Sequence, residues 1–277
     1  NHKNILNKDN LKECYDCYID NFKQDNRGFD AKVTEQFEGA SLEARLVFAH
    51  AEWLWAFAVD DIGYNKKIHY TRRNTQLSDE DLITDVYPVG FGSAGQWHTN
   101  NKYHEIKFTL GIINFIFENS NINSKEQILS YIEHICLYAK YEHETDDFPI
   151  TDEIIRITEG GNLAMYNILT HVGKPKKYER IASNNHKNSI VNSFGSLLTE
   201  EEKELNQDEK ISAIRKHLES CTREGFDFYE PEYRRVWNYS LSEEGFSEVQ
   251  ALQYKKAIIL YGPPGTSKTH TAKHLSE

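Results

Sequence analysis

The stretch KKAIILYGPPGTSKTHT, residues 255–271, decides how the rest of the chain is interpreted. Its apolar run, residues 257–261, has the composition and length of a buried parallel strand. GPPGTSKT follows at once, at residues 262–269. It fits the phosphate-binding loop pattern G-x-x-x-x-G-K-[ST] except at Ser267, where the pattern has glycine. The order of strand, loop and helix start therefore predicts a nucleotide-binding loop.

The residue types in this loop suit phosphate binding. Gly262 and Gly265 let the backbone turn, so that its N–H groups converge on phosphate oxygens. Lys268 begins a helix whose positive end faces the same anion, and its side chain is expected to reach the β- and γ-phosphates. Thr269 is expected to ligate Mg²⁺ through its hydroxyl, and the small Ser267 lets the loop form. The predicted site for ATP or GTP with Mg²⁺ is Gly262, Pro263, Pro264, Gly265, Thr266, Ser267, Lys268 and Thr269.

The parts that an NTPase needs for hydrolysis normally come later in the sequence. They are an acidic residue that positions Mg²⁺, a group that positions water and an arginine from a neighbouring subunit. The chain ends at Glu277, shortly after Thr269. We therefore interpret it as part of a longer NTP hydrolase and expect no catalytic residue, and no hydrolysis, within these 277 residues alone.

Composition is that of a globular chain, with 39% hydrophobic and 12% aromatic residues. The net charge of −11 argues against a generally basic surface and leaves room for a local basic groove. Cys14 and Cys17 form a single C-x-x-C, which we interpret as free thiols because no second pair follows. The sequence contains no apolar run of membrane-spanning length and no signal peptide, so a cytoplasmic protein without a membrane partner is expected.

Upstream of the loop, apolar residues recur mostly at helical spacing. Ser41 and Ser183 are good N-caps, and Ser124 with Gln127 forms a capping box. The helices expected from these patterns cover residues 41–59, 106–117, 124–136, 162–172 and 183–198.

These elements predict two parts in the chain. Residues 1–240 form a mainly α recognition or adaptor region, for which an α+β arrangement and a division near residue 174 stay open. Residues 241–277 begin an α/β P-loop NTPase domain with its first strand, loop and helix.

Two stretches are basic within this acidic chain. Residues 62–77 and residues 171–190 each carry a local charge of +4, whereas residues 199–232 carry −6. Lysine and arginine interleaved with aromatic rings suit contact with nucleic acid, and a solvated loop or hairpin over residues 62–77 is the alternative. We expect the two stretches to lie together in one positive groove. The candidate DNA-binding residues are Lys66, Lys67, Tyr70, Arg72, Arg73, Trp97, Lys174, Lys176, Lys177, Arg180 and Lys187.

A glycine-rich segment supplies one of these candidates, Trp97. Gly90, Gly92 and Gly95 read G-x-G-x-x-G, but Pro88 interrupts the preceding run and no βαβ unit is evident, so a dinucleotide site is not expected. We predict a polar loop here that presents its ring to a ligand. Trp97 and Tyr70 are the first candidates to stack on an extruded base.

The motor stretch, residues 255–275, resembles the AAA+ branch that contains the NTPase subunits of McrBC-type, modification-dependent restriction systems. The pieces AHAEWLWAF, GSAGQWHTNNKYHEI, KYERIASNNHKNSIVNSFGSLL and FDFYEPEYRRVW look like N-terminal regions found ahead of such motors in bacterial defence loci. The resemblance implies a hexameric motor that uses ATP or GTP, an N-terminal region that targets DNA, including modified DNA, and a McrC-like nuclease partner.

A second function class stays open at this point. The N-terminal region could instead bind protein, as the sensor or adaptor of a MoxR-like AAA+ remodelling ATPase, or serve assembly without a ligand. The net charge favours the adaptor, whereas the basic stretches and the resemblance favour DNA. Whether the two basic stretches share one face of the fold discriminates between them.

Overall fold

The computed structural model describes residues 5–75, 90, 92–119, 122, 124–142 and 150–238. Within these ranges every regular element is helical, apart from an isolated parallel bridge between Val59 and Gly92. The prediction of a mainly α region is therefore confirmed for the described residues. The predicted nucleotide site, residues 262–269, and the strand before it lie outside them.

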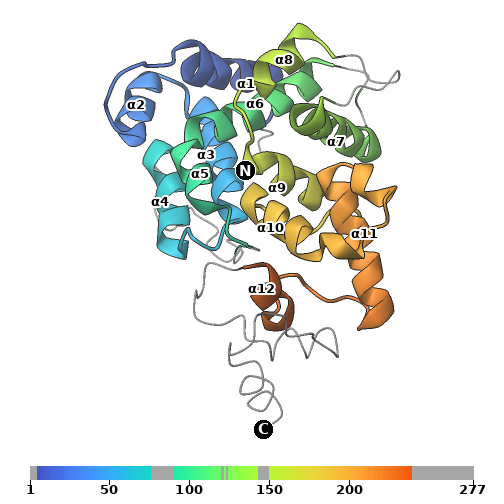
Figure 1. Ribbon diagram of the computed structural model, residues 1–277. Helices are drawn as coiled ribbons and strands as arrows, with labels where there is room; N and C mark the ends of the chain where they lie inside the picture. Colours follow the sequence, from blue (N-terminus) through green and yellow to red (C-terminus); the bar gives the residue numbers. More distant parts are fainter. Residues whose placement is uncertain are drawn as a thin grey trace, which may run out of the picture. The chain divides into compact units, whose positions relative to one another are not determined.

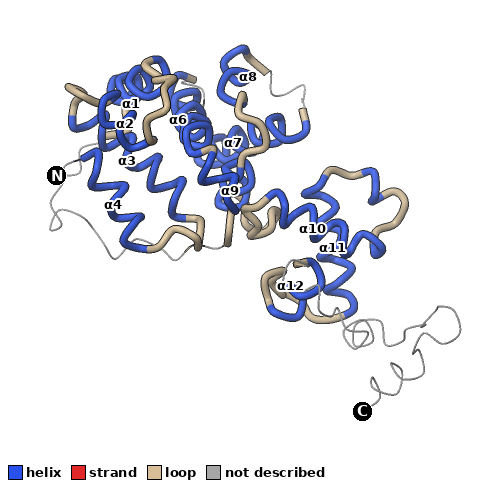
Figure 2. The backbone as a smooth tube through the Cα atoms, turned by 60° about the vertical axis from the view of Figure 1, so that its left-hand side comes forward, coloured by secondary structure: helices blue, strands red, loops and turns tan. Residues whose placement is uncertain are grey.

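Figures 1 and 2 show how the helices of the described ranges are arranged. The α-helices are α1 (Lys8–Tyr15), α2 (Phe29–Gln36), α3 (Leu42–Phe57), α4 (Tyr64–Thr75), α5 (Gly95–Asn100), α6 (Lys102–Glu118), α7 (Lys125–Tyr141), α8 (Asp152–Thr158), α9 (Ala164–Gly173), α10 (Asn184–Phe194), α11 (Gln207–Cys221) and α12 (Pro231–Trp237). A π-helical turn (Asp16–Asp20) follows α1, and two 3-10 turns (Gly195–Leu197 and Glu202–Glu204) lie between α10 and α11.

The chain divides into two compact units, residues 1–225 and residues 226–277. Helices α1 to α11 belong to the first unit and α12 to the second. In the second unit Trp237 is buried and donates from its Nε1 to the carbonyl oxygen of Phe228 at 2.7 Å. The predicted boundary near residue 240 stays a prediction, because residues from 239 onward are not among those described.

Local caps fix where several helices begin, as the sequence predicts. The Ser41 hydroxyl accepts from the N–H of Ala44 at 3.1 Å and begins α3. Ser124 and Gln127 satisfy each other's backbone N–H groups at 3.1 Å and begin α7. Ser183 begins α10 by accepting from the N–H of His186. These hydrogen bonds satisfy N–H groups that have no partner within their own helix.

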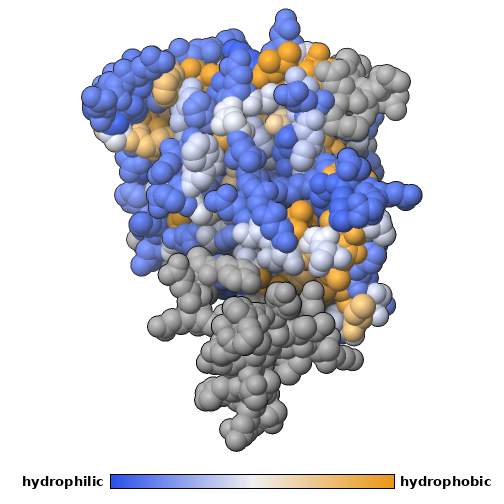
Figure 3. Space-filling view, viewed as in Figure 1, coloured by the Kyte–Doolittle hydropathy of each residue, from blue (hydrophilic) through white to orange (hydrophobic). Residues whose placement is uncertain are grey.

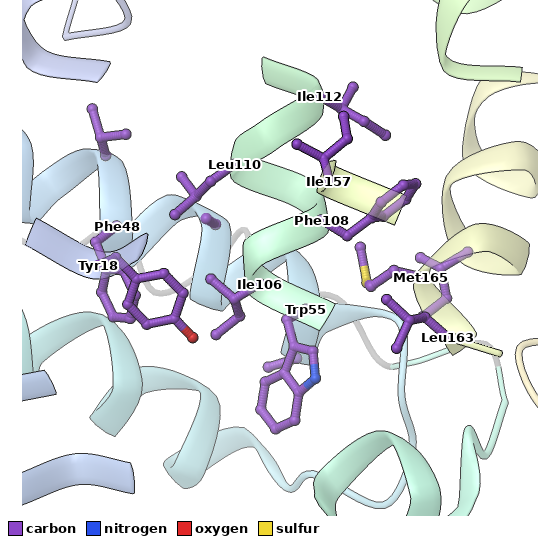
Figure 4. Packing of buried hydrophobic residues seen from close by; sticks show 14 of the residues in the cluster. Tyr18, Phe48, Trp55, Ile106, Phe108, Leu110, Ile112, Ile157, Leu163 and Met165 are labelled. Atoms are coloured by element: carbon purple, nitrogen blue, oxygen red, sulfur yellow. The ribbon is translucent and has the colours of Figure 1, made fainter. Parts of the chain in front are cut away.

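The core of the first unit is built around α6 (Figure 4). Ile106 and Phe108 of α6 are fully buried, as are Phe48 and Trp55 of α3. Each such side chain stabilises the fold by roughly 1.5–3 kcal/mol through removal of apolar surface from water. In the view of Figure 3 the described surface is mostly hydrophilic, and its hydrophobic residues are scattered.

The basic segment at residues 62–77, for which a loop or hairpin was the alternative, contains helix α4 instead. The helix packs along α3, and it buries Ile68 and brings the Tyr70 ring to 5.8 Å from that of Trp55. Such contacts between helices outweigh weak local helix signals. The predicted loop around Trp97 is also helical, since Trp97 lies on α5.

Within the described ranges, no helix combines the length and the apolar character that a membrane span requires.

Candidate functional site

The first basic stretch is largely engaged inside the fold. Lys67 is buried and donates from Nζ to the carbonyl oxygen of Phe57 at 2.9 Å, and burial lowers its pKa. Arg73 donates to the fully buried carboxylate of Glu52 at 2.5 Å and also pairs with Asp30. Of the other predicted residues on α4, Lys66 is exposed, whereas Arg72 and Tyr70 are half-buried.

Tyr70 is part of an aromatic cage around an internal lysine. The Lys102 ammonium lies 3.8 Å from the ring centroid of Tyr70, 4.4 Å from that of Phe29 and 4.5 Å from that of Trp55. It also donates to Glu52 at 2.6 Å. Burial lowers the pKa of Lys102, and Glu52 opposes the shift. The cage holds its own cation, so Tyr70 is not placed to stack on an external base.

The second basic stretch also pairs with carboxylates. Glu133 of α7 accepts from Lys174, from Lys177 at 2.8 Å and from the Tyr178 hydroxyl at 2.5 Å. Burial alone would raise the pKa of Glu133, but these hydrogen bonds outweigh it and lower the pKa to about 2. Further along, Lys187 is buried and donates to Asp208 of α11 at 2.5 Å. Lys176 is exposed and Arg180 is half-buried.

The structure does not bring the two basic stretches together in one groove. The cations of the first lie on α4, which packs on α3, whereas Lys174 and Lys177 lie against α7. Figure 1 shows α4 at one side of the first unit and α7 at the other, and the two are also apart in Figure 2.

Trp97 borders a hollow that we call the Trp97 pocket. Its ring is 55% exposed, on the surface of α5. The hollow measures ≈ 280 Å³ and lies where α5, α9 and α10 begin. Its described lining residues, none of which is charged, are Ala94, Gly95, Gln96, Trp97, Asn162, Ala164, Ser183, Asn184 and Asn185. Three of them, residues 183–185, belong to the second basic stretch.

A buried carboxylate holds the α9 wall of this pocket. Glu105 of α6 is fully buried, and it accepts from the N–H of Ala164 at 3.0 Å and from that of Met165 at 2.8 Å. These are the first N–H groups of α9, so the positive end of that helix is neutralised from inside. The helix therefore contributes to the shape of the pocket, whereas the partial positive charge at its N-terminus is already balanced by the Glu105 carboxylate.

His98, next to Trp97, anchors α5 to the core. Its ring stacks on that of Trp55 at 4.9 Å, and its Nε2 lies 3.0 Å from the Trp55 carbonyl oxygen. Because a carbonyl oxygen only accepts, Nε2 carries the proton. The Nδ1 atom lies 3.1 Å from Glu105 Oε1, without the angle of a good hydrogen bond. With one face of α5 fixed in this way, the neighbouring Trp97 ring remains on the surface.

A polar ring-bearing pocket of this kind suits a flat ligand with hydrogen-bonding edges. The indole can stack on such a ligand, and the asparagine and glutamine amides can both donate and accept. The volume lies just below the ~300–1,000 Å³ range of small-molecule sites. In the described part of the chain, no group of three or more His, Cys, Asp or Glu side chains is arranged to hold a metal ion.

Sequence reasoning singled out Trp97 and missed Glu105 and Asn184 at its pocket, as well as Glu52 beside the caged Lys102. Glu52 carried a signal, because it is the only acid in the apolar second half of α3 and therefore needs a buried partner. Glu105 and Asn184 carried none, because their partners are distant in the sequence.

Comparison with protein-family models, with curated proteins and with solved structures finds no match to this chain.

Proposed function

We propose that the protein is an AAA+ NTPase of a McrBC-like restriction system, in which residues 262–269 bind ATP or GTP with Mg²⁺. The observation that carries this proposal is that the apolar run at residues 257–261 is followed at once by GPPGTSKT in the sequence. The helical region ahead of it then acts as the recognition module. A hexameric assembly and a McrC-like nuclease partner belong to the same proposal through the resemblance of the motor stretch.

The recognition module binds DNA by taking a base into the Trp97 pocket. Three features support this role: the exposed indole, the amide-bearing wall and the absence of carboxylates among the described lining residues. Stacking of a base on an aromatic side chain is worth roughly 1–3 kcal/mol. Extruding a base from a duplex costs a few kcal/mol, least when the base is mismatched or damaged. Stacking and hydrogen bonds together can therefore offset the cost of extrusion.

A protein-binding adaptor of a MoxR-like ATPase is the second candidate. Two observations favour it. The two basic stretches do not form one groove, which was the feature that discriminates between the candidates. In addition, Arg73, Lys174, Lys177 and Lys187 already have carboxylate partners, in a chain of net charge −11. Cations paired in this way add little to the attraction of a polyanion. On this candidate, the Trp97 pocket receives a side chain of a partner protein instead of a base.

The nucleotide part of the proposal is tested by measuring the affinity of the protein for fluorescent ATP and GTP analogues in the presence of Mg²⁺. Lys268→Ala should abolish binding, because Lys268 is the residue expected to contact the β- and γ-phosphates. Lys273→Ala is the matched control, since it removes the same charge a few residues outside the motif. Equal affinities for the native protein and Lys268→Ala would contradict the proposed site.

A further inference from the structure

Two buried lysines share one buried carboxylate at the start of α11. Asp208, in the first turn of α11, accepts through Oδ1 from Lys187 of α10 at 2.5 Å and through Oδ2 from Lys140 of α7. The Tyr141 hydroxyl donates to the same Oδ2 at 2.9 Å. The side chains of Lys187, Lys140 and Asp208 are only 1%, 3% and 8% exposed. We call these three residues the Asp208 cluster.

The charges of the Asp208 cluster do not balance when both lysines are protonated. One ammonium group compensates the carboxylate, and the other adds a net positive charge to a site that water hardly reaches. Placing an excess charge in such a site is costly, and a buried amine avoids the cost by releasing its proton. The geometry of the cluster therefore favours a state in which one of the two lysines is neutral.

Lys187 is the lysine that is placed to lose its proton. Besides Asp208, its Nζ donates to the neutral Asn167 Oδ1 at 2.8 Å, and the carbonyl oxygen of Ala182 fixes the Asn167 amide in this orientation at 2.9 Å. A neutral amine keeps two N–H groups, which suffice for both acceptors. Burial, followed by the charge of Lys140, lowers the pKa of Lys187 to about 7. Lys187 can therefore become neutral without losing either hydrogen bond.

The other titratable groups around the cluster do not change their charge near neutral pH. Cys136 and Tyr141 lie on α7, and Tyr178 lies between α9 and α10. Burial raises the pKa of each of these three groups, so they stay neutral. Burial alone would raise the pKa of Asp208, but the charges of the two lysines outweigh it and lower the pKa, so this carboxylate stays charged.

We propose that the Asp208 cluster is a pH-sensitive contact that holds the N-terminus of α11 against α7 and α10, and that the contact becomes stronger as Lys187 releases its proton above neutral pH. In the unfolded chain Lys187 is an ordinary lysine that stays protonated up to about pH 10. Folding at pH 8 therefore releases a proton, and the folded state becomes more stable as the pH rises. Below neutral pH Lys187 is protonated in both states, so this dependence ends.

The position of the cluster gives this contact its consequence. Helix α11 is the last helix of the first unit, and the chain continues from it into the second unit. The protonation state of Lys187 thus determines how firmly the end of the first unit is held.

The test measures the unfolding equilibrium constant of the intact chain at pH 6.5 and pH 8.5, by urea titration followed by circular dichroism. Lys187→Met removes the titrating group and leaves Asp208 with Lys140 and Tyr141. The ratio of the native constant to that of Lys187→Met should fall by roughly 20-fold between the two pH values, because the pKa of Lys187 moves from 10.5 to about 7 on folding. Groups that titrate equally in both proteins cancel from this ratio.

Lys140→Met distinguishes the proposed contact from a purely structural role of Lys187. The variant leaves Lys187 and Tyr141 on Asp208, so the charges balance and Lys187 keeps its proton to higher pH. Most of the pH dependence should then disappear. Loss of a purely structural lysine would lower the stability by the same factor at both pH values. This variant also keeps the test decisive if Lys187→Met fails to fold.

Lys177→Met is the matched control. Lys174 and Lys177 also share one carboxylate, that of Glu133, but their side chains are 35% and 62% exposed, so water compensates the excess charge. The ratio of the native constant to that of Lys177→Met should stay constant within about twofold. A ratio that changes by less than about threefold for Lys187→Met or for Lys140→Met, or an equally large change for Lys177→Met, would overturn the inference.

Discussion

Replacing Glu105 by glutamine should destabilise the fold although the two side chains have nearly the same shape. Glu105 is fully buried, and its two oxygens each accept one N–H of α9, at 3.0 and 2.8 Å. Glutamine has one oxygen, so its amide group would face a second N–H donor. One buried N–H group then lacks an acceptor, and the negative charge at the N-terminus of α9 is lost.

The magnitude follows from these two losses. A hydrogen bond to a charged group is worth about 1.5–3 kcal/mol. The interaction of a carboxylate with a helix N-terminus adds about 0.3–1 kcal/mol at the surface and up to ~2 in buried geometry. We expect the free energy of unfolding to fall by about 2–4 kcal/mol, which is a large part of the ~5–15 kcal/mol typical of a domain. Urea titration followed by circular dichroism measures it.

Glu209→Gln is the control, because Glu209 caps the first turn of α11 at an exposed position. Glutamine can make the same single hydrogen bond to the Asn206 N–H, so the change should stay below about 0.5 kcal/mol. Equal effects of the two substitutions, or a loss below ~1 kcal/mol for Glu105→Gln, would refute the account of how the α9 wall is held.

Two further predictions concern stability. Gly111→Ala should destabilise the fold by about 1–3 kcal/mol, because the added Cβ would lie 2.4 Å from a methyl carbon of Ile157. Gly195→Ala is the control. It has open space around its Cβ, so it should leave the free energy of unfolding nearly unchanged in the same urea titration. Acidification should remove the stabilisation that comes from Glu133. Its folded pKa of about 2 lies below the usual value of 4.5, so its contribution is complete above pH 4.5 and is lost toward pH 2. The loss of about 3 kcal/mol should be absent in Glu133→Gln, and an unchanged pH profile in that variant would contradict the assignment.

The parts of the fold that were predictable from the sequence are those decided by neighbouring residues. Ser41 and Ser183 begin α3 and α10 as expected, because an N-cap acts on N–H groups two or three positions away. Helix α4 was not predictable in this way, since its stability comes from contacts with α3. Trp97 was correctly predicted as an accessible ring, because little of its own neighbourhood is apolar enough to bury it.

The prediction of one basic groove was wrong, because the sequence does not show which lysines and arginines are paired inside the fold. Counting lysines gives a local charge, but it does not reveal that Lys187 meets Asp208 or that Lys67 meets the backbone of α3. The partner of Lys140, Asp208, is also distant along the chain. Charge pairing across such separations depends on the packed fold, so the number of cations available to a polyanion can be judged only from the structure.

The most direct measurement for the recognition module is the affinity of the chain for methylated and unmodified duplexes as a function of salt concentration, compared between the native protein and Trp97→Ala. Trp53→Phe serves as control, because Trp53 stacks on Phe57 outside the pocket. The account predicts salt-dependent binding, with log affinity falling by about 0.9 per tenfold rise in salt for each phosphate contact. It also predicts a preference between the duplexes that Trp97→Ala loses and Trp53→Phe keeps. If the chain did not bind either duplex, the result would contradict base recognition and favour the adaptor function. The same conclusion would follow if its affinity were equal for the two duplexes and unchanged in Trp97→Ala.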